Sequence, residues 1–212
     1  MKLGEIALLS IIQAAGWPIW PLILCSILAL ALIAERLFQL RTSKILPAKL
    51  MDQALDATRR GFPNEDVIAK LENTGLTGTV LASGLRALQM NPQATNEDVH
   101  SSMEMAGRVA AQELERYLPT LATIASAAPL LGLLGTVVGM IEIFGAHTAG
   151  NNQPAQLAHG ISVALYNTAL GLIVAIPALM FWRYFRGVVD GHLLAMEQVS
   201  ERFARHLAHL RD

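Results

Sequence analysis

Residues 128 to 140 read A-P-L-L-G-L-L-G-T-V-V-G-M, and this uncharged stretch decides the fold. It combines three glycines and a proline with a single hydroxyl, that of Thr136. Small residues let helices approach closely in a membrane, and a threonine hydroxyl can bond across such a contact. We interpret the stretch as a packed helix interface. The alternative is an ordinary membrane helix, because glycine is common there and threonine can bond to its own helix.

The composition is too apolar for a chain that is soluble throughout its length. Of the 212 residues, 53% are hydrophobic and only 16% are charged, whereas a soluble domain carries about 25% charged residues. The formal net charge of −1 gives no indication of nucleic-acid binding. Cys25 is the only cysteine, so neither an internal disulfide nor a cysteine-rich metal site can form.

Three apolar segments reach the roughly 20 residues that a helix needs to cross a bilayer. We predict an all-α membrane protein with transmembrane helices at residues 17–40, 117–146 and 157–185. Trp17, Trp20 and Trp182 lie near the ends of these spans, where tryptophan favours the headgroup region. Residues 1–16 are expected to form an amphipathic helix at the membrane surface.

Polar segments connect and follow the spans. Residues 41–116 predict an insert of three or four helices, the last starting near Thr95 and Asp98, which have capping-box spacing. We expect one helix from Asp98 to Phe144, extending the second span into water. Residues 147–156 are expected to form a short loop.

Residues 186–212 predict an amphipathic C-terminal helix. One face carries the apolar side chains, namely Met196, Val199, Phe203, Leu207 and Leu210. Such a helix needs a partner surface. We expect that surface to be the helical insert of the same chain, with a separate protein as the alternative.

The basic residues predict the orientation. Lys2 alone precedes the first span and the 147–156 loop has none, while all the others lie in residues 36–116 and 183–211. By the positive-inside rule, the N-terminus and the loop lie on the outer side of the membrane. The insert and the C-terminus then lie in the cytoplasm.

The sequence contains no enzyme signature. It lacks a G-x-S-x-G elbow, an H-E-x-x-H motif, a P-loop and a dinucleotide fingerprint. Its six histidines are scattered without the spacing of metal ligands. We therefore expect no enzymatic activity, no metal and no cofactor.

The third span repeats small residues in a helical pattern. They are Ala164, Thr168, Gly171 and Ala175. We expect Ala164, Gly171 and Ala175 to serve helix packing, as we expect of Gly132, Gly135 and Gly139 in the second span. Thr136 lies eight residues before Phe144, and Thr168 lies eight residues after Gly160. At 1.5 Å per residue, both hydroxyls are about 12 Å from the outer surface. Two antiparallel neighbours would present them at one level.

Each of these two spans contains a proline, Pro129 or Pro177. Proline frees the carbonyl four residues earlier, here that of Ala125 or Ile173. We expect helix kinks at both places. The alternative is that the freed carbonyls face water in a pore.

Two motifs carry a family resemblance. G-L-L-G-T-V-V-G-M at 132–140, followed by G-I-S-V-A-L-Y-N-T-A-L-G-L-I-V-A-I-P-A at 160–178, resembles the paired signature of the MotA/TolQ/ExbB proton-channel family. The likeness is closest to ExbB-type biopolymer transport proteins. The Glu35-Arg36 pair at the end of the first span, the large insert and the three-span topology also resemble that family.

The resemblance implies a homopentamer in the bacterial inner membrane, with a dimer of ExbD-like single-span proteins in its lumen. It implies that protons pass through the complex and that a TonB-like protein carries the work to the outer membrane. By position, Thr136 and Thr168 match the threonines that line the lumen in the family. The translocated ion would be the proton.

The sequence departs from the family at Val163, where many members have glutamate. Either that acid is dispensable, or another replaces it; Glu142 is the only acid at the outer end of the second span. A carboxylate there is a functional candidate, and snorkelling to the headgroups is the alternative. Ser162, Tyr166 and Asn167 are further candidate pore or partner contacts.

Two other functions remain open. A TolQ-like subunit of the Tol-Pal envelope system would conduct protons in the same way but would act on a different partner system. A membrane scaffold would use the glycines and threonines only to pack helices. A flagellar MotA-like role fits less well, because those proteins have four spans.

Overall fold

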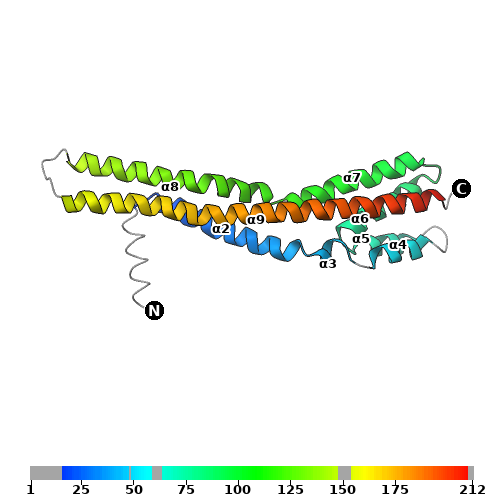
Figure 1. Cartoon of the computed structure of the whole chain (residues 1–212). Helices are drawn as coiled ribbons and strands as arrows, with labels where there is room; N and C mark the ends of the chain where they lie inside the picture. Colours follow the sequence, from blue (N-terminus) through cyan, green and yellow to red (C-terminus); the bar gives the residue numbers. More distant parts are fainter. Residues whose placement is uncertain (1–15, 48, 59–63, 148–153, 210–212) are drawn as a thin grey trace. The chain divides into compact units, whose positions relative to one another are not determined.

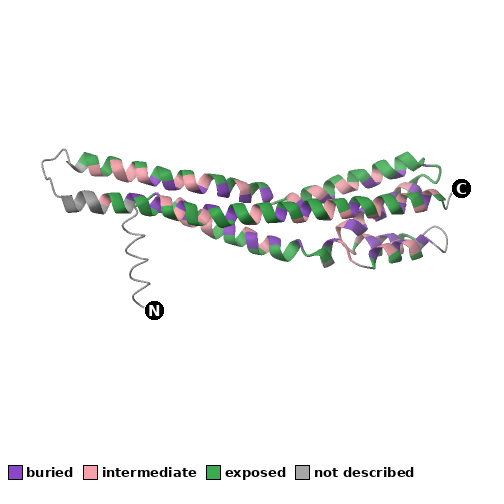
Figure 2. Cartoon of the chain, viewed as in Figure 1, coloured by how far each residue is buried: buried purple, intermediate pink, exposed green. Residues whose placement is uncertain are grey.

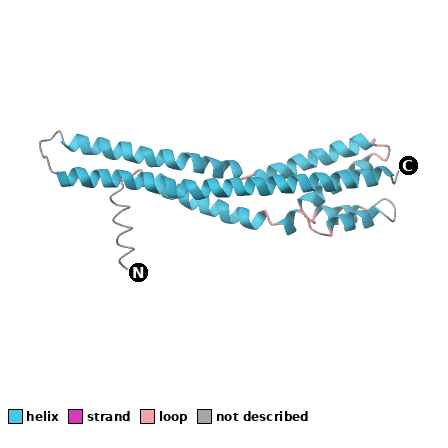
Figure 3. Ribbon diagram, viewed as in Figure 1, coloured by secondary structure: helices cyan, strands magenta, loops and turns pink. Residues whose placement is uncertain are grey.

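The computed structural model describes residues 16–47, 49–58, 64–147 and 154–209, which form helices joined by short turns, with no strand among them (Figures 1 and 3). In chain order the helices are α2 (Ile19–Gln39), α3 (Thr42–Ile45), α4 (Leu50–Thr58), α5 (Glu65–Glu72), α6 (Leu76–Met90), α7 (Asn96–Glu115), α8 (Leu118–His147) and α9 (Pro154–His209). The predicted all-α fold is confirmed. The amphipathic helix predicted within residues 1–16 lies outside the described residues, apart from residue 16.

Three of the described helical segments are long and apolar enough to cross a membrane. They are Ile19–Gln39, Asn96–Gly145 and Gly160–His209, with mean hydropathies of 2.0, 2.0 and 1.9 over their most apolar stretches. The prediction of three membrane-spanning helices is therefore confirmed by length and composition. α9 begins at Pro154, inside the predicted 147–156 loop, because proline is well suited to the first turn of a helix.

The helix expected from Asp98 to Phe144 is interrupted by a turn at Arg116 and Tyr117. α7 therefore ends at Glu115, and α8 begins at Leu118. Pro119 explains the interruption, because it has no N–H to donate to the carbonyl of Glu115. The sequence prediction overlooked this proline.

The chain divides into two compact units. The first takes in the described part of Met1–Glu35 together with Tyr117–Arg183, and the second takes in Arg36–Arg116 and the described part of Tyr184–Asp212. In the first unit, α2, α8 and the Pro154–Arg183 part of α9 meet at a core of Leu22, Ala128 and Ala175. Exposed residues recur along these helices (Figure 2). They include the large apolar residues Leu30, Leu130, Leu165 and Ile173. Such a surface is typical of helices that contact lipid.

The second unit has its own core. Ile68, Leu81 and Leu85 are buried among the helices α5, α6 and α7, and Gly84 of α6 lies directly against Met103 of α7. An added methyl group at Gly84 would lie 2.7 Å from the Met103 sulfur. A larger residue here would require the flexible Met103 side chain to move.

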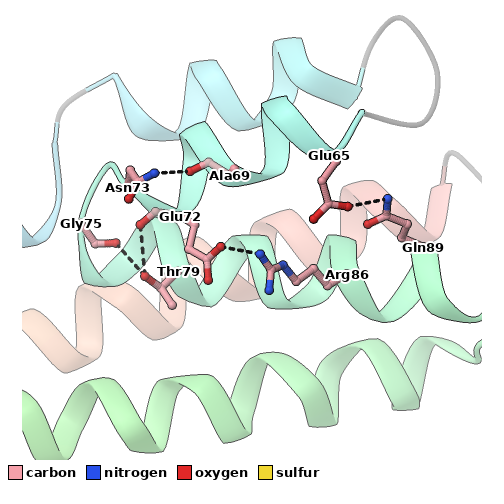
Figure 4. Close-up of polar contacts among 8 residues, drawn as sticks. All are labelled: Glu65, Ala69, Glu72, Asn73, Gly75, Thr79, Arg86 and Gln89. Atoms are coloured by element: carbon pink, nitrogen blue, oxygen red, sulfur yellow. Dashed lines mark hydrogen bonds and ion pairs between the residues drawn. The ribbon is translucent and has the colours of Figure 1, made fainter.

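Polar contacts join α5 to α6 at the surface of this unit (Figure 4). The Arg86 guanidinium pairs with Glu72 at 2.7 Å, and the Gln89 amide donates to Glu65 at 3.0 Å. Thr79 donates to the backbone carbonyls of Glu72 and Gly75 at the turn between the helices. The two side-chain pairs are exposed and contribute little to stability, whereas the Thr79 bonds are partly buried.

The end of α9 packs in the second unit. Met196, Phe203 and Leu207 are buried there, which confirms the predicted apolar face for these three residues, while Leu210 lies outside the described residues. Ring nitrogens make two of its polar contacts: His192 with the carbonyl of Leu40 at 3.2 Å and His206 with the Thr58 hydroxyl at 3.1 Å. The tail therefore packs against its own chain.

Candidate functional site: a polar helix pair within the membrane-spanning unit

Glycines of α8 make the close contact with α9. A methyl group at Gly132 would lie 2.7 Å from the carbonyl oxygen of Asn167, and one at Gly139 would lie 3.3 Å from the Cβ of Ala164. One at Gly135 would lie 2.6 Å from the Cβ of Asn167. Only hydrogen fits at Gly132, where the neighbour is backbone, and at Gly135, where the neighbour is the Asn167 side chain, so the two helices approach closely at these positions.

Small residues of α9 complete the contact. A methyl group at Gly171 would lie 2.6 Å from the carbonyl oxygen of Ala128. Ala164 and Ala175 are both buried, and Ala175 belongs to the apolar core of the unit. The small residues singled out in the two sequence motifs thus lie along one interface, the arrangement expected for helices packing in lipid.

Thr168 bonds across this interface. Its Oγ1 donates to the carbonyl oxygen of Gly132 at 3.3 Å. In an α-helix that carbonyl also accepts the N–H of the residue four positions later, which is Thr136. The backbone of Thr136 and the side chain of Thr168 therefore share one acceptor.

Thr136 directs its own hydroxyl differently. Its Oγ1 donates to the carbonyl of Leu133 in the same helix at 2.7 Å, and its side chain is half-buried. Thr168 lies against Gly132, one helical turn before Thr136, and the hydroxyls of the two threonines have different acceptors. Both hydroxyl oxygens keep lone pairs that can accept a hydrogen bond from water.

The other candidates occupy different surroundings. Asn167 is 1% exposed and lies against Gly135 in the helix contact, whereas Tyr166 and Ser162 are exposed on α9. Glu142 is exposed on α8. The Val163 side chain lies outside the described part of the structure. Of the polar candidates on α9, the structure thus brings Thr168 and Asn167 into the helix contact.

Pro129 and Pro177 lie inside α8 and α9, and both helices continue through them. A proline at either position leaves the carbonyl four residues earlier without its helical donor. The predicted kinks stay predictions. The carbonyl of Ala128 faces Gly171 in the helix contact. Pro129 follows Ala128 directly, so the missing backbone N–H of this proline lies next to that contact.

One buried charge was missed by the sequence reasoning. Arg36, 5% exposed in the second unit, donates from Nη1 to the carbonyl of Leu114 at 2.9 Å. That carbonyl belongs to the last turn of α7, where helical donors run out. A cation also interacts favourably with the negative end of the helix dipole. From the sequence, Arg36 marks only the end of an apolar span. Its acceptor could not be predicted, because Leu114 lies 78 residues away.

No group of histidine, cysteine, aspartate and glutamate side chains in the described ranges has the arrangement of a metal site. The first unit instead offers hydroxyls, an amide and backbone carbonyls at a tight contact between two membrane-spanning helices. This combination defines a helical membrane protein with polar side chains at the contact between two of its membrane-spanning helices.

The chain belongs to the MotA/TolQ/ExbB proton channel family, whose model matches residues 72–198. Among its relatives, the biopolymer transport protein exbB1 of Vibrio cholerae is 39% identical over 78% of this chain and 73% of its own length. The putative biopolymer transport protein ExbB-like 3 of Synechocystis is 34% identical over 83% of each chain. The Tol-Pal system protein TolQ of Haemophilus influenzae is 34% identical over 75% of this chain and 73% of its own length. The chain is thus a membrane protein of the ExbB/TolQ type.

Proposed function

We propose that this chain is the proton-conducting subunit of an ExbB-ExbD type motor in the bacterial inner membrane. The motor would use the proton motive force to energise TonB-dependent transport across the outer membrane. Family membership and the ExbB-type relatives support this proposal. The observation that carries it is the bond of the Thr168 hydroxyl across a tight helix pair to the carbonyl of Gly132, one helical turn before Thr136.

A single chain offers too few polar groups to surround a proton path through the membrane. We infer that copies assemble into a ring, a pentamer by analogy with the family, with Thr136 and Thr168 of each copy on the inner wall. Threonine hydroxyls hold water by accepting and donating hydrogen bonds, and they do not trap a proton as a carboxylate would. An ExbD-like single-span protein in the lumen would supply the acid that takes up and releases the proton.

The outer end of the path has its own candidates. Glu142 is exposed on α8, and Ser162 and Tyr166 are exposed on α9, so all three can face a neighbouring copy or the lumen protein. In this proposal Glu142 provides the acid that Val163 does not. The N-terminus and the 147–156 loop face the periplasm, as the distribution of basic residues predicts.

The proposal is tested with Thr136→Val and Thr168→Val in vesicles that contain the complex with its single-span partner. Valine has nearly the shape of threonine without the hydroxyl, so the ring should form and proton flux should be lost. Thr123→Val is the matched control, because Thr123 is an exposed threonine of α8 that donates only to the carbonyl of Pro119 in the described structure. Flux at the wild-type rate in both test variants would exclude a pore role.

A TolQ-type role is the second candidate, and the relationship to the Haemophilus TolQ favours it. The physics of the helix pair would be the same, and only the periplasmic client would differ. Co-purification of the partner proteins distinguishes the two: an ExbD- and TonB-like pair indicates the first function, and Tol-Pal components indicate the second. A scaffold of either kind would show no proton flux.

A further inference from the structure

The outer face of α7 is apolar in its middle. Met105 is 68% exposed and Val109, one helical turn further on, is 62% exposed, whereas the other exposed residues of α7 are polar. Both point away from the buried face of this helix, which carries Met103 and Ala110. Exposed apolar side chains that lie together on a polar helix indicate a surface that another molecule covers.

The second unit carries a matching face on α9. Leu194 is 57% exposed and lies three residues after Gly191, on the side of α9 opposite the buried Met196 and Phe203. A methyl group at Gly191 would have no atom within 4 Å. This face therefore offers a shallow position beside an apolar side chain, where a protruding residue can fit.

Two contacts within the second unit fix the level of α7 against α9. Glu115 lies 3.1 Å from Arg186, and His100 lies 3.4 Å from Glu201. These contacts are fifteen residues apart on α7 and fifteen residues apart on α9. The two helices are therefore antiparallel, and each step along one matches a step back along the other.

A ring transfers these levels from one copy to the next. Copies in one membrane share one orientation, so rotation about the ring axis keeps corresponding residues at the same depth. The two contacts place Val109 level with His192, next to Gly191, and Met105 level with a residue two positions from Leu194. Where α7 of one copy faces α9 of the next, the two pairs would match within about 3 Å along the helix. Val109 and Gly191 do not line the groove between α7 and α9 of the same copy.

The charges at the far end of the two faces are complementary. α7 begins with the exposed acids Glu97 and Asp98, and α9 exposes Arg202 and Arg205 near its end. The same spacing brings these acids to the level of the two arginines. Opposite charges at matching places favour the correct partner and its alignment.

We propose that the outer face of α7 in one copy, with Glu97, Met105 and Val109, binds the face of α9 in the next copy that carries Gly191, Leu194 and Arg205. One chain carries both complementary faces at equal levels, so the occupant is a second copy of this chain. The contact joins two different faces, which closes into a ring when the rotation fits. The inference rests on the proposed function for the ring itself.

Disulfides between two differently tagged chains test the contact. In a Cys25→Ser background, Val109→Cys in one chain and Gly191→Cys in the other should give a linked dimer in membranes, as should Met105→Cys with Leu194→Cys. The control pairs Val109→Cys with Gln198→Cys, on the same face of α9 but about 10 Å further along, beyond the reach of a disulfide. We expect the control yield to be at least about tenfold lower. No dimer in either test pair, or a control yield equal to theirs, would overturn the proposal.

A bulky residue gives a second test. Gly191→Trp should prevent the ring, measured by native mass spectrometry of the complex, because tryptophan would fill the place of the neighbour's Val109. The open space at Gly191 lets a single copy fold. Gly107→Trp is the matched control, since Gly107 also has open space and lines the groove of about 780 Å³ within one copy. An intact ring in Gly191→Trp, or an equal loss in Gly107→Trp, would contradict the assigned face.

Proton flux separates this proposal from the proposed function. Thr136→Val should keep the disulfide between positions 109 and 191 while losing flux. If this variant conducts normally and the disulfide forms, the proposed function fails and the contact stands. If flux is lost in Thr136→Val but no disulfide forms in the ring, the contact is wrong and the proposed function stands.

Discussion

The hydroxyl of Thr168 donates to the carbonyl of Gly132 at 3.3 Å, across the contact between α8 and α9. A carbonyl oxygen has two lone pairs, so this acceptor serves both the helical N–H of Thr136 and the side chain of Thr168. The bond is long, and water competing for either partner can replace it at little cost. A hydroxyl held this loosely can take part in a water chain without breaking the helix.

Thr168→Ser is expected to conduct protons, unlike Thr168→Val. Serine keeps the hydroxyl and removes only a methyl group, so the donor to Gly132 remains. The measurement compares flux in partner-containing vesicles for serine, valine and wild type. Equal loss in the serine and valine variants would mean that the methyl group matters and the hydroxyl does not.

Gly171→Ala is expected to destabilise the membrane-spanning unit. The added methyl group would lie 2.6 Å from the carbonyl oxygen of Ala128, and backbone cannot yield as a flexible side chain can. Overpacking of this kind costs about 1–3 kcal/mol. Thermal unfolding of the purified protein in detergent should show a lower Tm.

Gly187→Ala is the control for that experiment. Gly187 also lies in α9, but nothing lies within 4 Å of its added methyl group. Alanine exceeds glycine in helix propensity by about 1 kcal/mol. The Tm should therefore stay the same or rise, and a fall as large as that of Gly171→Ala would show that close contact with Ala128 is not the cause.

Arg36→Met is expected to loosen the last turn of α7. Methionine retains the apolar stem and removes the donor to Leu114, and an unsatisfied buried acceptor costs about 1–3 kcal/mol. Hydrogen exchange should accelerate in residues 113–118. Arg108→Met removes an exposed i,i+4 pair with Glu104 and should have no such effect at that junction. Unchanged exchange in Arg36→Met would contradict the capping role.

Acid is expected to weaken the start of α7. The Thr95 hydroxyl and, to a smaller extent, its backbone N–H donate to Asp98 and lower the pKa of that carboxyl below 3.8. The folded state therefore favours the carboxylate, so the stabilisation is present above the ordinary pKa and is lost as the pH falls through the lowered one. Amide exchange in the first turn, corrected for intrinsic rates, should rise over that window. Asp98→Asn should remove this pH dependence, whereas the control Glu97→Gln should keep it. If exchange in Asp98→Asn still depends on pH, a group other than Asp98 is responsible.

Glu142→Gln is expected to reduce energy coupling without preventing assembly. Glutamine keeps the shape and polarity of the exposed side chain but cannot carry or release a proton. Growth that depends on TonB-type import, compared with the amount of assembled complex, measures the effect. Full coupling in this variant would mean that Glu142 takes no part in proton transfer and that the single-span partner supplies the only acid.

Local patterns predicted much of the fold. The capping box of Thr95 and Asp98 is present at the start of α7, and the buried face of the tail includes Phe203, because both depend on residues close in sequence. The small-residue motifs likewise mark the contact between α8 and α9. The turn at Arg116 was available in the sequence through Pro119 and was overlooked.

Contacts distant in sequence could not be predicted. The spacing placed Thr136 and Thr168 at equal depth, yet nothing in it indicated that one hydroxyl would cross to the other helix and one would not. That choice depends on the rotation of each helix about its axis. The burial of Arg36 depends in the same way on a partner in α7, far along the chain.

The contact between His206 and Thr58 has a consequence for the tail of α9. The Thr58 hydroxyl donates to the carbonyl of Leu55 at 2.9 Å, so it can only accept from the imidazole, which fixes the neutral ring as the Nε2–H tautomer. His192 must likewise donate, because its partner is a carbonyl oxygen. Both attachments therefore need an N–H donor from the tail, and a side chain that can only accept hydrogen bonds could replace neither histidine.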